Sequence, residues 1–293
     1  MATHALVPLI HAPTTELVSR VTGVDLVNSA ESVPRFFPSR DAQLFGVYHA
    51  PGGASLRNDG VVLCYPGPQE YAQVHWAYQK LAKMLSAAGL HVLRFDYSCT
   101  GDSRGASADA SLTNWSDDIS AAASELRDVA DIRRVSVVGM RLGGALALRA
   151  VANGLKVKNV VLWDPVVSGR DYVRALNAAE DLRLGLLFFP ESKQRVDVEL
   201  MGYPFPGRLR SETESVDLLT EPIGRVERVM LVGARFSVAQ LELQRRLEES
   251  GMAVTAARVD DPALYDEGRH PRDTILSHSI PVAITEFLTG RDR

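Results

Sequence analysis

The chain has 293 residues, of which 46% are hydrophobic and 23% are charged, and its formal net charge is −4. This length and apolar content suit one domain with a sizeable core and a modest insertion. The small net charge, with Lys and Arg scattered along the chain, gives no electrostatic case for binding nucleic acid.

The cysteines and the first residues set expectations about the cellular compartment. Cys64 falls in an apolar segment typical of a buried strand, so we expect no disulfide with Cys99 and a location in the reducing cytoplasm. Residues 1–20 lack a basic stretch followed by a long apolar run, so we expect no secretory signal. No apolar stretch approaches the ~20 residues that cross a bilayer, so we expect no membrane span.

Apolar periodicity predicts strands that alternate with helices along most of the chain. The first 35 residues have no regular pattern and are interpreted as an N-terminal arm. After them the predicted strands are 43–49, 61–65, 91–97, 135–140, 160–163, 229–232 and 254–259. The predicted helices are 76–88, 113–129, 142–153, 240–250 and 280–288. This alternation is typical of a parallel sheet with helices on both faces.

The connection between the predicted strands 160–163 and 229–232 is too long for a simple crossover. We interpret residues 166–225 as a small cap, or lid, inserted into the domain. Residues 36–165 and 226–293 then form the core.

The most informative motif is Gly139-Met140-Arg141-Leu142-Gly143, between a predicted buried strand and a predicted helix. Strand, sharp turn and helix in this order are typical of the nucleophile elbow G-x-S-x-G. Both glycines are present, but Arg141 stands where the nucleophilic serine is expected. A guanidinium stays protonated and cannot attack a carbonyl, so the ordinary serine-hydrolase mechanism cannot run at this turn.

Two further regions carry a family resemblance. Residues 95–105, FDYSCTGDSRG, resemble the D-x-R-G-x-G-x-S-x-G loop of serine-aminopeptidase-like and lysophospholipase-like hydrolases. Together with the elbow, residues 64–71 and 162–165 resemble the hydrolase-like proteins found beside exosortase and secondary-metabolite gene clusters, many of which carry R-L-G in place of S-x-G. The resemblance covers residues 36–290 and implies an α/β-hydrolase fold: a mostly parallel eight-stranded sheet with helices on both faces and a small cap after strand 6.

The resemblance also implies a catalytic triad in the order Ser, Asp or Glu, His. Arg141 occupies the serine position. Asp164 fits an acid position after the strand 160–163, and its alternative role is a helix cap or a loop ion pair. His270 fits the histidine position before the last helix, and its alternative is a solvated loop residue.

The sequence retains more of the expected oxyanion site than of the catalytic triad. Its expected backbone donors are the N–H of Leu142 and that of Gly67 or Gln69, and Met140 is expected to border the same site. These donors, the positive end of the elbow helix and Arg141 together predict an anion site.

Two other arrangements stay open. Arg141 can instead fold back onto Asp96 or Asp164 as a structural ion pair. In the second arrangement, the nucleophile is not at the elbow but is Ser98 or Cys99. Both residues lie at the carboxyl end of a predicted strand, where ligands bind in open α/β sheets.

A thiol at Cys99, near Arg141 and a histidine, can have a lowered pKa, but the favoured role of Cys99 is that of a packed loop cysteine without chemistry. His75 is expected to reach the pocket.

The sequence contains no metal-binding or nucleotide-binding motif, so we predict no metal and no cofactor.

Three functions fit these features. The first is an atypical enzyme acting on an acyl (ester or thioester) or carboxylate-bearing small molecule in secondary-metabolite, lipid or polysaccharide biosynthesis, with His270 as base or Arg141 stabilising an enolate in a lyase or cyclase. The second is a hydrolase or acyltransferase with a relocated nucleophile. The third is a catalytically inactive scaffold that binds a metabolite or a partner protein. We favour the first two, and homodimer formation stays open.

Overall fold

The computed structural model describes residues 32–52, 56–186, 198–259 and 278–290. Within them, eight strands form one sheet in the order β1-β2-β4-β3-β5-β6-β9-β10. Strand β2 runs antiparallel to β1 and β4, and the other neighbouring strands are parallel. The predicted mostly parallel eight-stranded sheet is confirmed.

The strands of this sheet match the seven predicted ones and add one more. They are β1 Ser32–Ser39, β2 Ala42–His49, β3 Asp59–Cys64, β4 His91–Phe95, β5 Arg134–Met140, β6 Asn159–Trp163, β9 Arg228–Gly233 and β10 Ala253–Arg258. Strand β1 was not predicted, and its first residues fall within the segment interpreted as an arm. It contains Pro34 and Pro38, which are tolerated here because β1 lies at the edge of the sheet.

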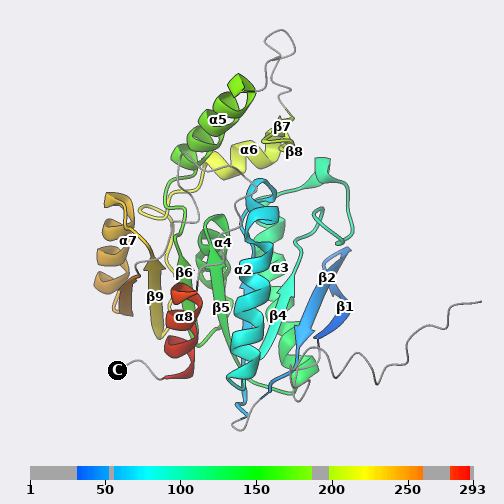
Figure 1. The fold of residues 1–293 in the computed structure, drawn as a ribbon, viewed down its shortest axis with the longest axis vertical. Coiled ribbons are helices and arrows are strands. Elements are labelled where there is room, and N and C mark those ends of the chain that lie inside the picture. The colour runs from blue at the N-terminus through cyan, green and yellow to red at the C-terminus, as the bar shows by residue number, and fades with distance from the viewer. Residues whose placement is uncertain (1–31, 53–55, 187–197, 260–277, 291–293) are drawn as a thin grey trace, which may run out of the picture.

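Helices cover both faces of the sheet (Figure 1). Helices α2 (Pro68–Ala87) and α8 (Ser279–Thr289) pack together on one face, and α3 (Leu112–Ala130) and α4 (Leu142–Ala152) pack on the other. Because β3, β5 and β6 are covered on both sides, almost all of their residues are buried, which explains their continuous apolar sequences.

Helix α2 starts eight residues before the predicted helix. Its first residue is Pro68, and proline is favoured there because the first amide of a helix needs no partner and the ring presets a helical φ. Helix α7 (Val238–Glu249) starts with a capping box between Ser237 and Gln240. Among the described residues, no helix has the length and apolar character needed to cross a membrane.

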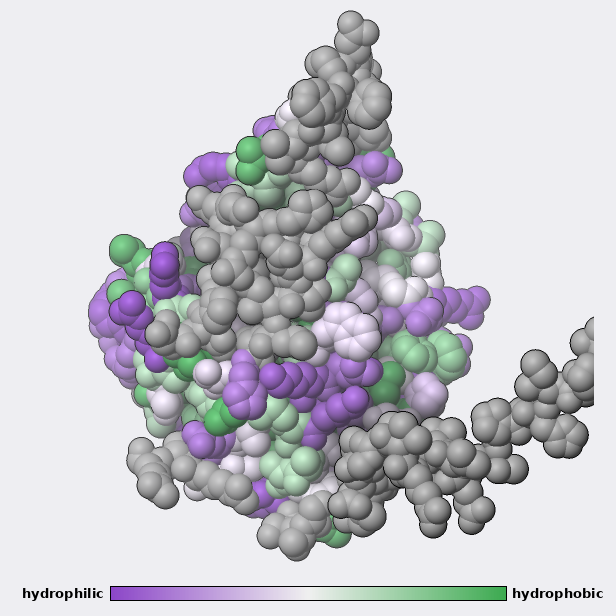
Figure 2. All heavy atoms as spheres, viewed as in Figure 1, coloured by the Kyte–Doolittle hydropathy of each residue, from purple (hydrophilic) through white to green (hydrophobic). Residues whose placement is uncertain are grey.

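The described part of the chain between β6 and β9 lies apart from the sheet. It contains α5 (Gly169–Leu186), β7 (Glu199–Leu200), β8 (Tyr203–Pro204) and α6 (Gly207–Glu214). These elements lie beyond the carboxyl ends of the parallel strands (Figure 1). Their role as a lid stays a prediction. On the face seen in Figure 2, the described residues mix hydrophilic and hydrophobic side chains.

Candidate functional site

Arg141 occupies the sharp turn between β5 and α4, with φ 53° and ψ −120°. A positive φ is uncommon for a residue other than glycine, and it is typically stored at functional sites. The flanking glycines make the turn possible. A Cβ on Gly143 would lie 2.4 Å from the carbonyl oxygens of Cys64 and Tyr65, and one on Gly139 would lie 2.4 Å from the carbonyl oxygen of Gly143. The elbow therefore has the backbone that the sequence predicts.

The side chain of Arg141 binds two carboxylates. Its Nε lies 3.2 Å from Oε1 of Glu70, and its Nη1 lies 3.3 Å from Oδ2 of Asp164. The guanidinium carbon is 5.7 Å from the ring centroid of Tyr172. This arrangement agrees with the predicted alternative in which Arg141 folds back onto Asp164. The prediction named Asp96 as the other partner, whereas the structure has Glu70.

Glu70 is a residue of the candidate site that the sequence did not reveal. It lies in the first turn of α2 with only 1% of its surface exposed, and its Oε2 accepts a hydrogen bond of 2.9 Å from the Tyr172 hydroxyl. Tyr172 belongs to α5 and lies 102 residues further along the chain than Glu70. Acidic residues are common in the first turn of a helix, so nothing local distinguishes Glu70.

Burial and charge act against each other in this pair. Burial raises the pKa of Glu70, although the charge of Arg141 and the hydrogen bond from Tyr172 oppose this. Burial alone would lower the pKa of Arg141, but the charges of Glu70 and Asp164 outweigh it and raise that pKa. The guanidinium is therefore a fixed cation with two carboxylates already bound.

Asp164 follows β6 and is held from two sides. Its Oδ1 accepts a hydrogen bond of 2.8 Å from Nε2 of Gln240, which also donates to the carbonyl of Pro165 at 3.0 Å. The other oxygen faces Arg141. Asp164 thus lies beside the elbow, as both of its predicted roles require.

The predicted backbone donors come from two helix N-termini that meet at this site. Leu142 is the first residue of α4, and Gly67 is the N-cap of α2. A Cβ on Gly67 would lie 3.7 Å from Cδ2 of Leu142 and 3.2 Å from the hydroxyl of Tyr172. Gln69 is buried beside them, and its Nε2 has no hydrogen-bond partner among the described residues. Met140 is fully buried in β5, so its side chain belongs to the core.

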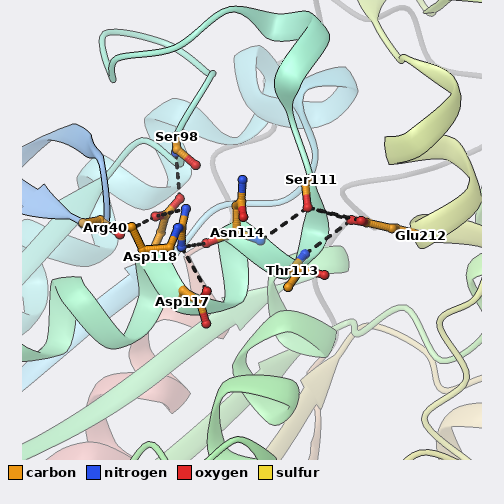
Figure 3. A network of polar contacts seen from close by, with 9 residues as sticks. Arg40, Ser98, Ser111, Thr113, Asn114, Asp117, Asp118 and Glu212 are labelled. Atoms are coloured by element: carbon orange, nitrogen blue, oxygen red, sulfur yellow. Dashed lines mark hydrogen bonds and ion pairs between the residues drawn. The ribbon is translucent and has the colours of Figure 1, made fainter.

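The structure does not support an activated thiol at Cys99. Burial raises its pKa, and the charges of Asp109 and Asp118 raise it further, which agrees with the favoured role of a packed loop cysteine. Ser98 belongs to a polar network, in which its N–H donates to Oδ2 of Asp118 at 2.8 Å (Figure 3). Its carbonyl accepts from Nε1 of Trp115 at 2.9 Å.

The predicted histidines lie elsewhere or are not described. His75, on α2, stacks against Tyr65 with ring centroids 6.4 Å apart, and burial lowers its pKa. His270 lies outside the described residues. Within the described ranges, no three His, Cys, Asp or Glu side chains are grouped as metal ligands.

A cavity of about 200 Å³ lies beside this cluster, at the carboxyl ends of β3 and β4. Tyrosines, prolines and small residues form most of its wall, which also contains Asp96 and Cys99. Tyr203 and Leu209, from the segment between β6 and β9, complete it. The predicted residue Cys99 therefore borders a cavity, whereas Ser98 and His75 are not part of its wall.

An elbow between β5 and α4, a donor loop after β3 and an acid after β6 define a protein of the α/β-hydrolase fold. Residues 57–218, more than half of the chain, match the family described as serine aminopeptidase, S33, and the chain belongs to this family. The resemblance to serine-aminopeptidase-like hydrolases is thereby confirmed, and the resemblance to proteins beside exosortase and secondary-metabolite gene clusters stays a prediction.

Solved structures with the same fold include several esterases. The Pyrococcus furiosus esterase Pf2001 has a TM-score of 0.59 at 18% identity, over 96% of this chain and 95% of its own. An arylesterase has a TM-score of 0.60 at 19% identity, over 95% of this chain and 90% of its own. Est1E from Butyrivibrio proteoclasticus, bound to ferulic acid, has a TM-score of 0.58 at 16% identity, over 87% of this chain and 98% of its own. At such identities the likeness concerns the fold alone. No curated protein matches the chain by sequence.

Proposed function

We propose that this chain binds a small acyl compound, an ester or a thioester, beneath the segment 166–225 and does not hydrolyse it through a nucleophile at the elbow. The observation that supports this is the pairing of Arg141 with Glu70 and Asp164, at 3.2 and 3.3 Å. A guanidinium at the serine position cannot attack a carbonyl.

The same pairing argues against a carboxylate as the group bound at Arg141. A ligand carboxylate would have to displace Glu70 or share the guanidinium with it. Breaking a buried ion pair on one side costs about 3–5 kcal/mol, because the remaining charge is left uncompensated. An uncharged acyl group avoids this cost, and backbone donors such as the N–H of Leu142 suit its carbonyl oxygen.

A second candidate is an enzyme that moves protons without an elbow nucleophile. Its support is Glu70, a buried carboxyl with a raised pKa beside Tyr172, which is a combination typical of general acid–base groups. His270 would assist, as the sequence predicts. A place in secondary-metabolite, lipid or polysaccharide biosynthesis is a proposal that rests on the family resemblance.

Hydrolysis of p-nitrophenyl butyrate and butyryl thioesters separates the two candidates. We expect no turnover by the wild type, and a gain of esterase activity in Arg141→Ser combined with Glu70→Gln, which removes the partner charge as well. Turnover by the wild type that is lost in Glu70→Gln or His270→Ala would instead support the second candidate. Loss in Cys99→Ala would identify a relocated nucleophile and contradict the proposal.

A further inference from the structure

The cavity of about 200 Å³ is distinct from the ion-pair cluster, since Arg141, Glu70 and Asp164 are not part of its wall. It exceeds the cavity of about 150 Å³ that accommodates benzene in an engineered protein core. It can therefore hold a small organic group, and the chemistry of its wall indicates which kind.

Four tyrosines border the cavity, and three of their hydroxyls already have protein partners. The hydroxyl of Tyr97 donates to the carbonyl of Tyr65 at 3.1 Å, and that of Tyr71 donates to Oδ1 of Asp96 at 2.9 Å. The hydroxyl of Tyr65 accepts from Nη1 of Arg94 at 2.9 Å. What these tyrosines offer a ligand is aromatic surface, and the negative face of an aromatic ring attracts cations.

Asp96 is the acidic residue in the described wall of this cavity, and it is 5% exposed. Besides the bond from Tyr71, it accepts one from the N–H of Asp102 at 3.0 Å. Both bonds come from neutral donors, and each carboxylate oxygen can accept another. Among the described residues, no Lys or Arg forms an ion pair with Asp96.

The charge of Asp96 is thus incompletely compensated. Burial raises the pKa of this carboxyl in spite of its hydrogen bonds and of the charge of Arg94, which acts on it without forming an ion pair. A cation in the cavity would add the closer opposite charge that Asp96 lacks, and the described wall itself holds no Lys, Arg or His. An anion would meet a carboxylate instead.

We propose that this cavity binds an alkylated ammonium group of the choline type, with Asp96 as the counter-charge and the rings of Tyr65, Tyr71, Tyr97 and Tyr203 around it. This deepens the proposed function by naming a group that the acyl ligand carries. Only the statement that the ligand also carries an acyl group rests on the proposed function. Binding of the cation in the cavity does not depend on binding or chemistry at Arg141.

Two small probes of nearly the same shape test the proposal: choline, and 3,3-dimethylbutan-1-ol, in which carbon replaces the charged nitrogen. Titration calorimetry on the full chain should show choline binding about tenfold more tightly than the alcohol. Asp96→Asn, which keeps the acceptor for Asp102, should abolish this preference. Equal binding of the two probes to the wild type, or a preference that persists in Asp96→Asn, would overturn the proposal.

Alkylation of Cys99 locates the bound probe. Cys99 borders the cavity and Cys64 is fully buried, so iodoacetamide should modify Cys99 in the folded chain. Choline should slow this modification, and the alcohol should slow it much less at the same concentration.

If Asp96→Asn does not fold, Tyr71→Leu replaces it, and loss of choline protection is then the expected result. Choline that binds without protecting Cys99 would contradict the proposed location. The binding and protection experiments do not depend on the esterase assay of the Arg141 variants, so the proposed function and this proposal can fail separately.

Discussion

Nε of Arg141 lies 3.2 Å from Oε1 of Glu70, at the residue where the fold otherwise carries its nucleophile. This contact joins the start of α4 to the first turn of α2, on the opposite face of the sheet. Tyr172 of α5 binds the other oxygen of Glu70 and brings the segment between β6 and β9 into the same cluster. The pair therefore fixes three parts of the chain at the elbow.

Arg141→Ala should lower the free energy of unfolding by about 3–5 kcal/mol, because it leaves Glu70 buried without its counter-charge. Urea unfolding followed by the fluorescence of the buried Trp115 and Trp163 measures this change. Arg174→Ala, which breaks an exposed ion pair with Asp171, is the matched control and should leave the midpoint unchanged.

Removing both charges at the elbow should be tolerated better than removing one. Arg141→Met combined with Glu70→Gln leaves the partly exposed Asp164 as the remaining charge of the cluster, so we expect it to recover most of the stability lost in Arg141→Ala. A double variant as unstable as the single one would show that packing of the arginine, and not its charge, stabilises the elbow.

Gly143→Ala should destabilise the chain by about 3 kcal/mol or more, since the new Cβ would lie 2.4 Å from two backbone oxygens that cannot move freely. Gly185→Ala is the control: no atom lies within 4 Å of its Cβ position in α5. Alanine there should be neutral or stabilise the helix by about 0.5–1 kcal/mol. Thermal unfolding of both variants checks the contrast, and a soluble, equally stable Gly143→Ala would contradict it.

Glu212 of α6 caps the start of α3 (Figure 3). Its Oε2 accepts from the N–H of Leu112 at 2.6 Å and from the hydroxyl of Ser111 at 2.9 Å. Glu212→Ala should cost about 1–2 kcal/mol, as loss of a helix cap does. Chemical denaturation measures the loss, for which Glu248→Ala, on the exposed side of α7, serves as comparison.

The contribution of Glu212 should depend on pH. Burial tends to raise its pKa, but the hydrogen bonds that it accepts outweigh burial and lower the pKa below 4.5. Its stabilisation is therefore complete above pH 4.5 and lost as the pH falls through the folded-state pKa. The difference in stability between wild type and Glu212→Ala should shrink on acidification. A difference independent of pH would mean that the carboxylate charge plays no part in the cap.

His49 should make the fold sensitive to mild acid. It is buried in β2, where Nε2 accepts from Nε of Arg94 at 3.0 Å, so that Nδ1 carries the proton and faces the hydroxyl of Ser32 at 2.8 Å. Burial, together with the charge of Arg94, lowers the pKa of His49 from 6.5 to about 4. The unfolded chain therefore takes up a proton between these values and the folded chain does not.

Stability linked to His49 should be complete above pH 6.5 and decrease by up to about 3 kcal/mol as the pH falls to 4. Unfolding free energies measured across this range should be flatter in His49→Gln, whose amide oxygen can still accept from Arg94. An unchanged slope in His49→Gln would contradict the assignment.

Much of the fold followed from local patterns in the sequence. The continuous apolar run of β5 and the flanking Gly139 and Gly143 predicted a buried strand and an elbow, because both depend on neighbouring residues alone. Strand β1 was missed since an edge strand buries few side chains and tolerates proline. The start of α2 was placed too late, at residue 76, because the apolar spacing that predicts the helix begins after its first two turns.

The sequence by itself determined that an arginine replaces the nucleophile and that serine-type attack at the elbow is excluded, since this depends only on the chemistry of the side chain. Only the tertiary structure decided what that arginine does. Its partner Glu70 lies 71 residues earlier in the chain and becomes a neighbour because β3 pairs directly with β5, which brings the starts of α2 and α4 together. Burial then makes this ion pair costly to break, a property that no local pattern records.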